Sequence, residues 1–285
     1  ASHRISLMRS LALFDLAFLV LLLAVALREI LAGRNWRNLP LMLALVLLIA
    51  ANGLTHLETL GGYDSGLLGT RLGIATLVLL IGLIGGRIIP SFTRNWLVKR
   101  GSTALPAPFG TFDKLCLAAT LAALAGWVAA DTQPLTGAAL LVAGGLNLVR
   151  LARWQGRQSF SEPLVWSLHL GFLWLPLGLL ALGLGVVAPQ VLPPTAGLHA
   201  LTAGAIGGMT LAVMTRATLG HSGRDLKADG WTTVIYLAIA AAAALRVVAS
   251  LLPDLYLPLL TASGGAWTLA FGLFVIVYGR LHLSR

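Results

Sequence analysis

The chain alternates long apolar runs with short polar connections. Nine runs are about 20 residues long, and we predict a helix in each because that length suits the hydrocarbon core of a bilayer. The longest connection, 90–109, contains Pro90, Pro106 and Pro108, which we expect to keep it from being helical. The pattern predicts one all-α domain, a polytopic transmembrane helical bundle over residues 1–285. Its predicted spans are 11–30, 39–60, 67–89, 110–130, 135–153, 163–186, 196–219, 231–252 and 256–279.

Composition supports this interpretation. Of the 285 residues, 58% are hydrophobic and only 11% are charged, and the mean hydropathy is +0.87. A soluble domain has more charge and shorter apolar runs. The formal net charge of +10 could indicate nucleic-acid binding. However, the cations fall in short connections, where membrane topology explains them. We therefore expect the bilayer, and no nucleic acid, as a partner.

The cations are divided unequally between the two sides of the predicted bundle. Arg4, Arg9 and Arg71 are the three of the 20 Lys and Arg residues that fall on one side, while 16 fall on the other and Arg246 lies inside a span. Cytoplasmic connections are enriched in Lys and Arg, so the C-terminus is predicted to be cytoplasmic. The odd span count and the first residue, which is not Met, lead us to expect that the N-terminal spans of a longer protein are absent.

The seventh span is unusually polar for a membrane helix. In an uninterrupted α-helix, the 22 steps from His199 to His221 give roughly six turns plus about 40°, so both imidazoles would share one face about 33 Å apart. Polar groups at membrane depth usually face the bundle interior and have a function there. The polar residues of this segment are His199, Thr202, Thr210, Thr215, Arg216 and His221.

Topology sorts four histidines into two pairs. His56 and His199 fall near the extracytoplasmic face, and His169 and His221 fall near the cytoplasmic face. Neutral imidazole is a common metal ligand, and two from separate helices can hold a haem iron axially. The alternative is that each is an interfacial histidine or a hydrogen-bonded core histidine. The matched depths favour ligation.

Three arginines are candidates for binding anions. Arg87 ends the third span and Arg216 lies about one turn before His221, so their guanidinium groups could bind haem propionates. The alternative is that both anchor the chain at lipid headgroups. Arg246 lies inside the eighth span and requires a buried acid, a carbonyl or an anionic ligand. The candidate acids are Asp15, Glu58 and Asp254.

Other cofactor signals are weak or absent. The single cysteine, Cys116, excludes an internal disulfide, and no C-x-x-C-H segment is present for covalent haem attachment. Met209, Met214 and Cys116 are soft donors for copper, but they form no clustered motif. Pro176 interrupts the sixth span, where a kink could open space for a ligand.

Long segments of the chain resemble the NnrS family. The resemblance implies a multi-pass protein of the bacterial inner (cytoplasmic) membrane that contains non-covalent haem b and copper and is associated with denitrification and with resistance to nitric oxide and nitrosative stress. Nitric oxide would be a ligand, whereas the redox partner and any turnover stay open. The similar blocks are REILAGRNWRNLP at 28–40, GGRIIPSFTRNWL at 85–97, EPLVWSLHLGFLWLPLGL at 162–179 and HALTAGAIGGMTLAVMTRATLGHSGR at 199–224.

The resemblance also indicates which residues and spans are involved. Members typically have about twelve predicted spans, and this chain resembles the last nine. The usual first helix, with its W-H-A-H-E-M-like segment, has no counterpart here. His56 is a weaker cofactor candidate because it lies outside the similar blocks. The candidate residues that lie inside the similar blocks are His169, His199, His221, Arg87, Asn95 and Arg216.

Two other functions remain open from the sequence. A transporter without a redox cofactor could use Thr202, Thr210, Arg246 and the histidines as a polar pathway, with Pro176 breaking a helix. A membrane scaffold or a metal-delivery partner is the third alternative. The colour of the purified protein separates a haem protein from this transporter, because haem absorbs visible light and a chain without a redox cofactor does not.

Overall fold

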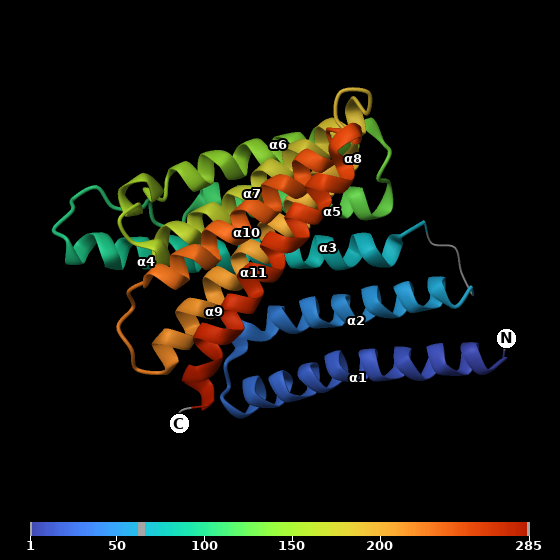
Figure 1. The fold of residues 1–285 in the computed structure, drawn as a ribbon, viewed down its shortest axis with the longest axis horizontal. Coiled ribbons are helices and arrows are strands. Elements are labelled where there is room, and N and C mark those ends of the chain that lie inside the picture. The colour runs from blue at the N-terminus through green and yellow to red at the C-terminus, as the bar shows by residue number, and fades with distance from the viewer. Residues whose placement is uncertain (1, 62–65, 284–285) are drawn as a thin grey trace. The chain divides into compact units, whose positions relative to one another are not determined.

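The computed structural model describes residues 2–61 and 66–283. Across these residues every regular element is helical, and nine helices are long and apolar enough to cross a membrane (Figure 1). The predicted all-α, multi-pass architecture is therefore confirmed. The chain divides into two compact units, Ala1–Leu80 and Ile81–Arg285, called unit 1 and unit 2 below.

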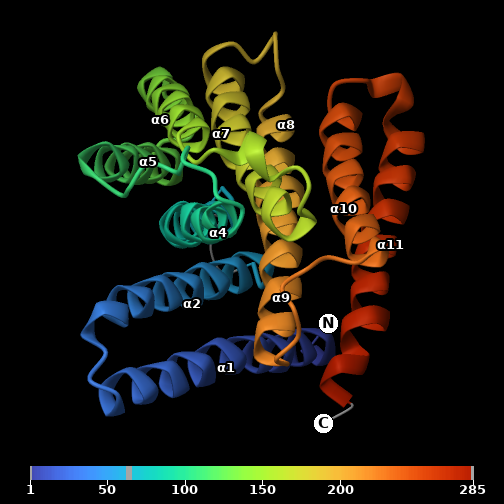
Figure 2. The ribbon, with the colours of Figure 1, turned by 90° about the vertical axis from the view of Figure 1, so that its left-hand side faces the viewer.

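Unit 1 is a layer of three helices. Helix α2 packs against both α1 and α3, and α1 and α2 run side by side in Figures 1 and 2. Gly69 permits the close approach of α3 to α2, because a Cβ there would lie 2.6 Å from the carbonyl oxygen of Ala51. The elements are α1 (Ser2–Ala32), η1 (Trp36–Asn38), α2 (Leu39–Thr59) and α3 (Leu68–Leu80).

Unit 2 is built around α7, which contacts α4, α6, α8, α9 and α10. Helices α10 and α11 form an antiparallel hairpin beside it (Figures 1 and 2). The elements are η2 (Ile81–Gly85), α4 (Gly86–Lys99), α5 (Thr111–Ala129), α6 (Pro134–Ala152), η3 (Gly156–Ser159), α7 (Pro163–Val187), α8 (Pro194–His199), η4 (Ala200–Ile206), α9 (Gly207–His221), α10 (Gly230–Ala249), η5 (Pro253–Leu255) and α11 (Tyr256–Leu283).

Local sequence explains where several helices begin. Pro134, Pro163 and Pro194 occupy first-turn positions, where the missing N–H costs no helical hydrogen bond. The carboxylate of Glu162 accepts a hydrogen bond from the Leu164 amide at 3.2 Å and caps α7. Asp229 caps α10 in the same way, accepting from the Thr232 amide at 2.7 Å.

The expectation that Pro90 ends the third span is wrong. The helix continues through Pro90 to Lys99, and the candidate membrane span covers Leu68–Lys99. Proline is tolerated within membrane helices because small local changes in helix geometry accommodate it. Such a change precedes Pro90, since the π-helical segment η2 covers Ile81–Gly85.

A second π-helical segment, η4, interrupts the seventh span at Ala200–Ile206. A π turn closes its hydrogen bonds from i to i+5 and so contains about one more residue than an α turn. An extra residue rotates everything that follows by about 100°. The single face calculated for His199 and His221 assumed an uninterrupted α-helix, so that prediction does not hold.

Candidate functional site

His199 borders a cavity in unit 2. It is the last residue of α8, it is half-buried, and its neighbours include Ser250 and Tyr256 from the far end of α10 and the start of α11. The cavity measures about 390 Å³, which is within the range of small-molecule sites, roughly 300–1,000 Å³. Its lining residues are Thr195, His199, Ala249, Ser250, Pro253 and Tyr256.

His169 is held inside unit 2 by protein contacts. Its Nε2 atom lies 2.8 Å from the Thr93 hydroxyl, which also donates to the carbonyl of Ile89 at 2.8 Å. Since that hydroxyl has one proton, the imidazole donates from Nε2 when Thr93 bonds Ile89. A Cβ on Gly156 would lie 2.6 Å from Nδ1, so the loop packs directly on the ring. This side chain fits the hydrogen-bonded core alternative better than it fits a metal ligand.

His221 and His56 lie in different settings. His221 ends α9 and is exposed. In unit 1, the Nε2 atom of His56 lies 2.9 Å from Oδ2 of Asp15, which also accepts a hydrogen bond from Asn52 at 2.8 Å. Metal-binding histidines commonly pair with a carboxylate in this way. The same contact is also an ordinary ion pair or hydrogen bond between two helices, so by itself it does not identify a metal ligand.

The predicted propionate arginines have protein contacts of their own. Arg216 places its guanidinium carbon 3.9 Å from the centre of the Phe92 ring, a cation–π contact between α9 and α4. The neighbouring Thr215 shares a 2.5 Å hydrogen bond with the hydroxyl of Tyr236 on α10. Arg87 is exposed on α4. Within the described residues, neither arginine forms an ion pair with a carboxylate.

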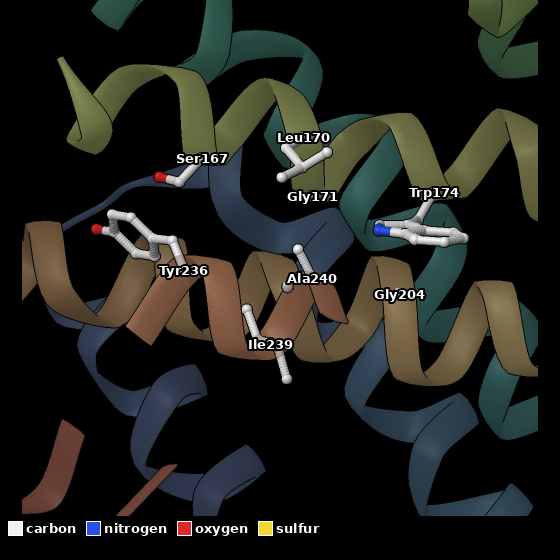
Figure 3. A pocket seen from close by; sticks show the side chains of 9 residues that line it. Ser167, Leu170, Gly171, Trp174, Gly204, Tyr236, Ile239 and Ala240 are labelled. Carbon is white, nitrogen blue, oxygen red and sulfur yellow. The ribbon is translucent and has the colours of Figure 1, made fainter. Parts of the chain in front are cut away.

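A second, much smaller cavity lies between α7, α9 and α10 (Figure 3). Its volume is about 10 Å³, about the space that one water molecule needs. Trp174 and Tyr236 stand at its ends, while Gly171 and Gly204 let the helices approach. The cavity is too small for a porphyrin. No site was predicted from the sequence at either aromatic residue.

Comparison with known proteins settles the family. A family model described as NnrS protein matches residues 2–285. The chain belongs to the NnrS family. No curated protein and no solved structure matches it. The membership covers essentially the whole chain, so the blocks that carried the resemblance are parts of one continuous match.

Of the histidine environments described in this NnrS-family chain, that of His199 fits haem best. His199 offers a half-buried imidazole beside a cavity of small-molecule size, with Arg246 within electrostatic range. His169 has protein neighbours at both ring nitrogens. Within the described part of the chain, no three His, Cys, Asp or Glu residues come together. The soft donor Cys116 is buried and its thiol lies 3.6 Å from the carbonyl of Leu146.

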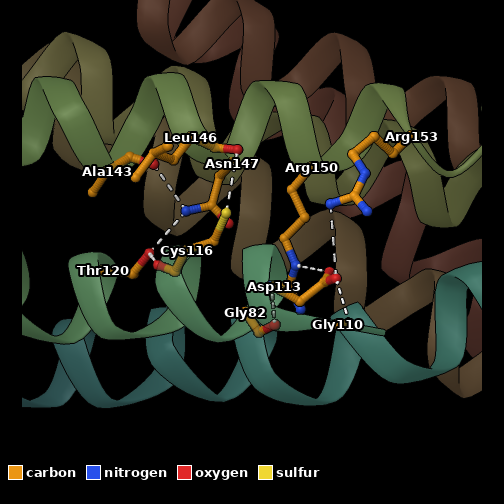
Figure 4. A network of polar contacts seen from close by, with 10 residues as sticks. All are labelled: Gly82, Gly110, Asp113, Cys116, Thr120, Ala143, Leu146, Asn147, Arg150 and Arg153. Carbon is orange, nitrogen blue, oxygen red and sulfur yellow. Dashed lines mark hydrogen bonds and ion pairs between the residues drawn. The ribbon is translucent and has the colours of Figure 1, made fainter. Parts of the chain in front are cut away.

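A buried ion pair in this NnrS-family chain was not predicted from the sequence. Arg150 was counted among the cytoplasmic connections, yet its side chain is 0% exposed at the end of α6. Its Nε donates to Oδ1 of Asp113 on α5 at 2.9 Å, and Nη1 donates to the carbonyl of Gly82 in η2 at 2.9 Å (Figure 4). Gly86 makes room, because a Cβ there would overlap the guanidinium. The pair joins the π segment to the α5–α6 hairpin.

A second polar contact continues along the same hairpin. Asn147 donates to the Thr120 hydroxyl at 2.8 Å and to the carbonyl of Ala143 at 2.9 Å (Figure 4). The donors and acceptors of both contacts lie in helices or next to them, on faces that pack against other parts of the protein. The network satisfies polar groups at membrane depth and therefore has a structural role.

Proposed function

We propose that this NnrS-family chain is a haem-binding membrane protein that acts in resistance to nitric oxide and nitrosative stress or in denitrification. The observation that carries the proposal is the family match over residues 2–285. The cavity beside His199 adds support, because an imidazole and a nearby guanidinium are groups that hold a haem iron and its propionates. The inner (cytoplasmic) membrane and a cytoplasmic C-terminus belong to the same proposal.

In this proposal His199 would hold the haem through its imidazole. When bound, the haem would supply an iron that binds nitric oxide. The protein would orient the group: Ala249 and Pro253 provide apolar wall, while Thr195 and Tyr256 provide hydroxyls at the cavity rim. His56, His169, His221, Arg87 and Arg216 remain predictions from the sequence. Copper is part of what the family resemblance implies, but we propose no copper site on the residues described.

The expected spectrum tests the proposal and the ligand together. The purified chain, loaded with ferric haem, should show a Soret band that shifts when nitric oxide is added. His199→Ala should lose most of that band, because it removes the imidazole beside the cavity. His169→Gln is the matched control, since glutamine can still bond Thr93 and the band should persist. The measurement is the Soret absorbance per protein after haem titration and removal of unbound haem.

Each spectral outcome has a separate meaning. If the unaltered chain acquires no Soret band, the haem proposal is wrong. A band that persists in His199→Ala shows that another residue is the ligand. A band lost in both variants shows that His169 is a ligand as well, provided that circular dichroism and gel filtration find both variants folded. If they find either variant unfolded, the loss reports damage to the fold.

A further inference from the structure

Arg246 carries a buried donor that no described residue satisfies. It lies near the end of α10, within the candidate span Gly230–Ala249. Its Nη1 atom is shielded from solvent and has no hydrogen-bond partner among the described residues, and no acid of unit 2 forms an ion pair with it there. Burying a charged donor without a partner is costly. A bound anion would satisfy this donor.

Each acid predicted as a partner of Arg246 has its own setting within its unit. In unit 1, Asp15 accepts from His56 and Asn52, and Glu58 accepts from the Leu67 amide at 3.0 Å. Asp254 is exposed in η5 and forms no ion pair with Arg246 among the described contacts. No hydrogen bond joins the guanidinium to a carbonyl among the described residues either, so within unit 2 an anionic ligand is the explanation left from the sequence.

Arg246 is connected to the cavity beside His199 through its helix and through His199, although it is not one of the lining residues. Helix α8 packs against α10, and Arg246 interacts electrostatically with His199. Ala249 and Ser250, which line the cavity, follow Arg246 by three and four residues and so lie on the same helix face. The rim presents an imidazole and three hydroxyl groups, and no carboxylate lines it. Of these hydroxyls, Ser250 donates to the Arg246 carbonyl at 3.4 Å.

We infer that this cavity binds an anionic group, with Arg246 as the principal donor and His199 and Tyr256 beside it. Guanidinium binds carboxylate and phosphate oxygens through two parallel hydrogen bonds. The cavity volume of about 390 Å³ exceeds that of such a group alone, and Ala249 and Pro253 give it apolar wall. The ligand is therefore an amphiphile that carries an oxyanion.

Two sources supply that chemistry. One is a carboxylate side chain of the haem, in which case the inference rests on the proposed function and assigns to Arg246 the role first predicted for Arg87 and Arg216. The other is the phosphate of an anionic lipid headgroup, which does not require haem. The guanidinium makes the same contacts in both cases.

The first arm of the test compares ferric haem with its dimethyl ester, whose propionates carry no charge. Arg246→Gln should weaken haem binding by about 10- to 100-fold, as expected for a lost charge-assisted hydrogen bond. The ester should bind the unaltered chain and Arg246→Gln equally. Arg246→Lys keeps the charge but cannot form the two parallel hydrogen bonds of a guanidinium, so its affinity for haem should be intermediate. Arg94→Gln, which changes an exposed arginine on α4, is the control.

The second arm measures thermal unfolding of the same haem-free proteins in mixed micelles. If a lipid phosphate is the ligand, phosphatidylglycerol should raise the melting temperature of the unaltered chain and of Arg94→Gln, and phosphatidylcholine should not. Arg246→Gln should lose that increase, because a ligand stabilises only the state that binds it. If Arg246→Gln does not fold, Tyr256→Phe, which removes a rim hydroxyl, should reduce the same responses.

The two arms separate the outcomes. A loss specific to haem identifies the carboxylate, and a loss specific to phosphatidylglycerol identifies the phosphate. If the chain binds no haem, the proposed function fails and the lipid arm alone decides the anion site. Responses of the Arg246 and Tyr256 variants that match those of the unaltered chain in both arms would overturn the site.

Discussion

Replacing Asp113 with Ala is expected to lower the free energy of unfolding by about 3–5 kcal/mol, the usual cost of breaking a buried ion pair. Arg150 is 0% exposed, and its Nε donates to Asp113 at 2.9 Å. Without the carboxylate, the guanidinium would retain only the carbonyl of Gly82 as a hydrogen-bond acceptor among the described residues, because its Nη2 atom already has none. The charge cannot leave the core without displacing η2, so the variant should unfold far more readily.

Unfolding in mixed micelles of increasing sodium dodecyl sulfate measures this effect. Arg153→Gln is the matched control, because Arg153 lies 3.9 Å from the same carboxylate and is 34% exposed. Removing a partly exposed pair of this kind should change stability by less than about 1 kcal/mol. Combining Asp113→Asn with Arg150→Met removes both charges and should cost less than the two single changes added together. Equal losses from Asp113→Ala and Arg153→Gln would show that the buried pair does not stabilise the fold.

The transmembrane spans could be predicted because the length and the apolar character of a run of residues are read directly from the sequence. A run of about 20 apolar residues is needed to cross a bilayer, and all nine predicted spans correspond to helices of suitable length and composition. The π-helical segments could not be predicted in this way. Hydrophobicity along Ile81–Gly85 and Ala200–Ile206 is the same whether hydrogen bonds close at i+4 or i+5. The prediction that Pro90 ends the third span was wrong for a related reason, since the effect of a proline depends on the local helix geometry.

The site was predictable only in part. The polar seventh span drew attention to His199, which borders a cavity. Depth alone could not show that His169 bonds Thr93, a residue 76 positions away. The burial of Arg150 could not be predicted, because a cation at the end of a span has the same sequence signature whether its side chain is exposed or lies in a core. Asp113 near the start of one span and Arg150 near the end of the next were the available signal, since a short turn brings those two ends together.

Gly197→Ala is expected to destabilise unit 2 by about 3 kcal/mol, at the upper end of the usual cost of overpacking. A Cβ at Gly197 would lie 2.4 Å from the backbone nitrogen of Leu182 and 2.6 Å from its Cα atom. These are backbone atoms of α7, so no side-chain rotation relieves the overlap and α8 must move away. His199 lies two residues later on the same helix, so the cavity beside it should change as well.

Gly265→Ala on α11 is the matched control, because a Cβ there meets no atom within 4 Å. An open helical position should tolerate alanine with a change of at most about 1 kcal/mol, in the stabilising direction if helix propensity dominates. The measurements are unfolding in mixed micelles and, for haem-loaded protein, the Soret absorbance per chain. Gly197→Ala should lose both stability and haem, whereas Gly265→Ala should keep both. If the two alanine variants unfold alike, α7 and α8 do not meet as closely as their glycine contact indicates, and the position of His199 would need another support.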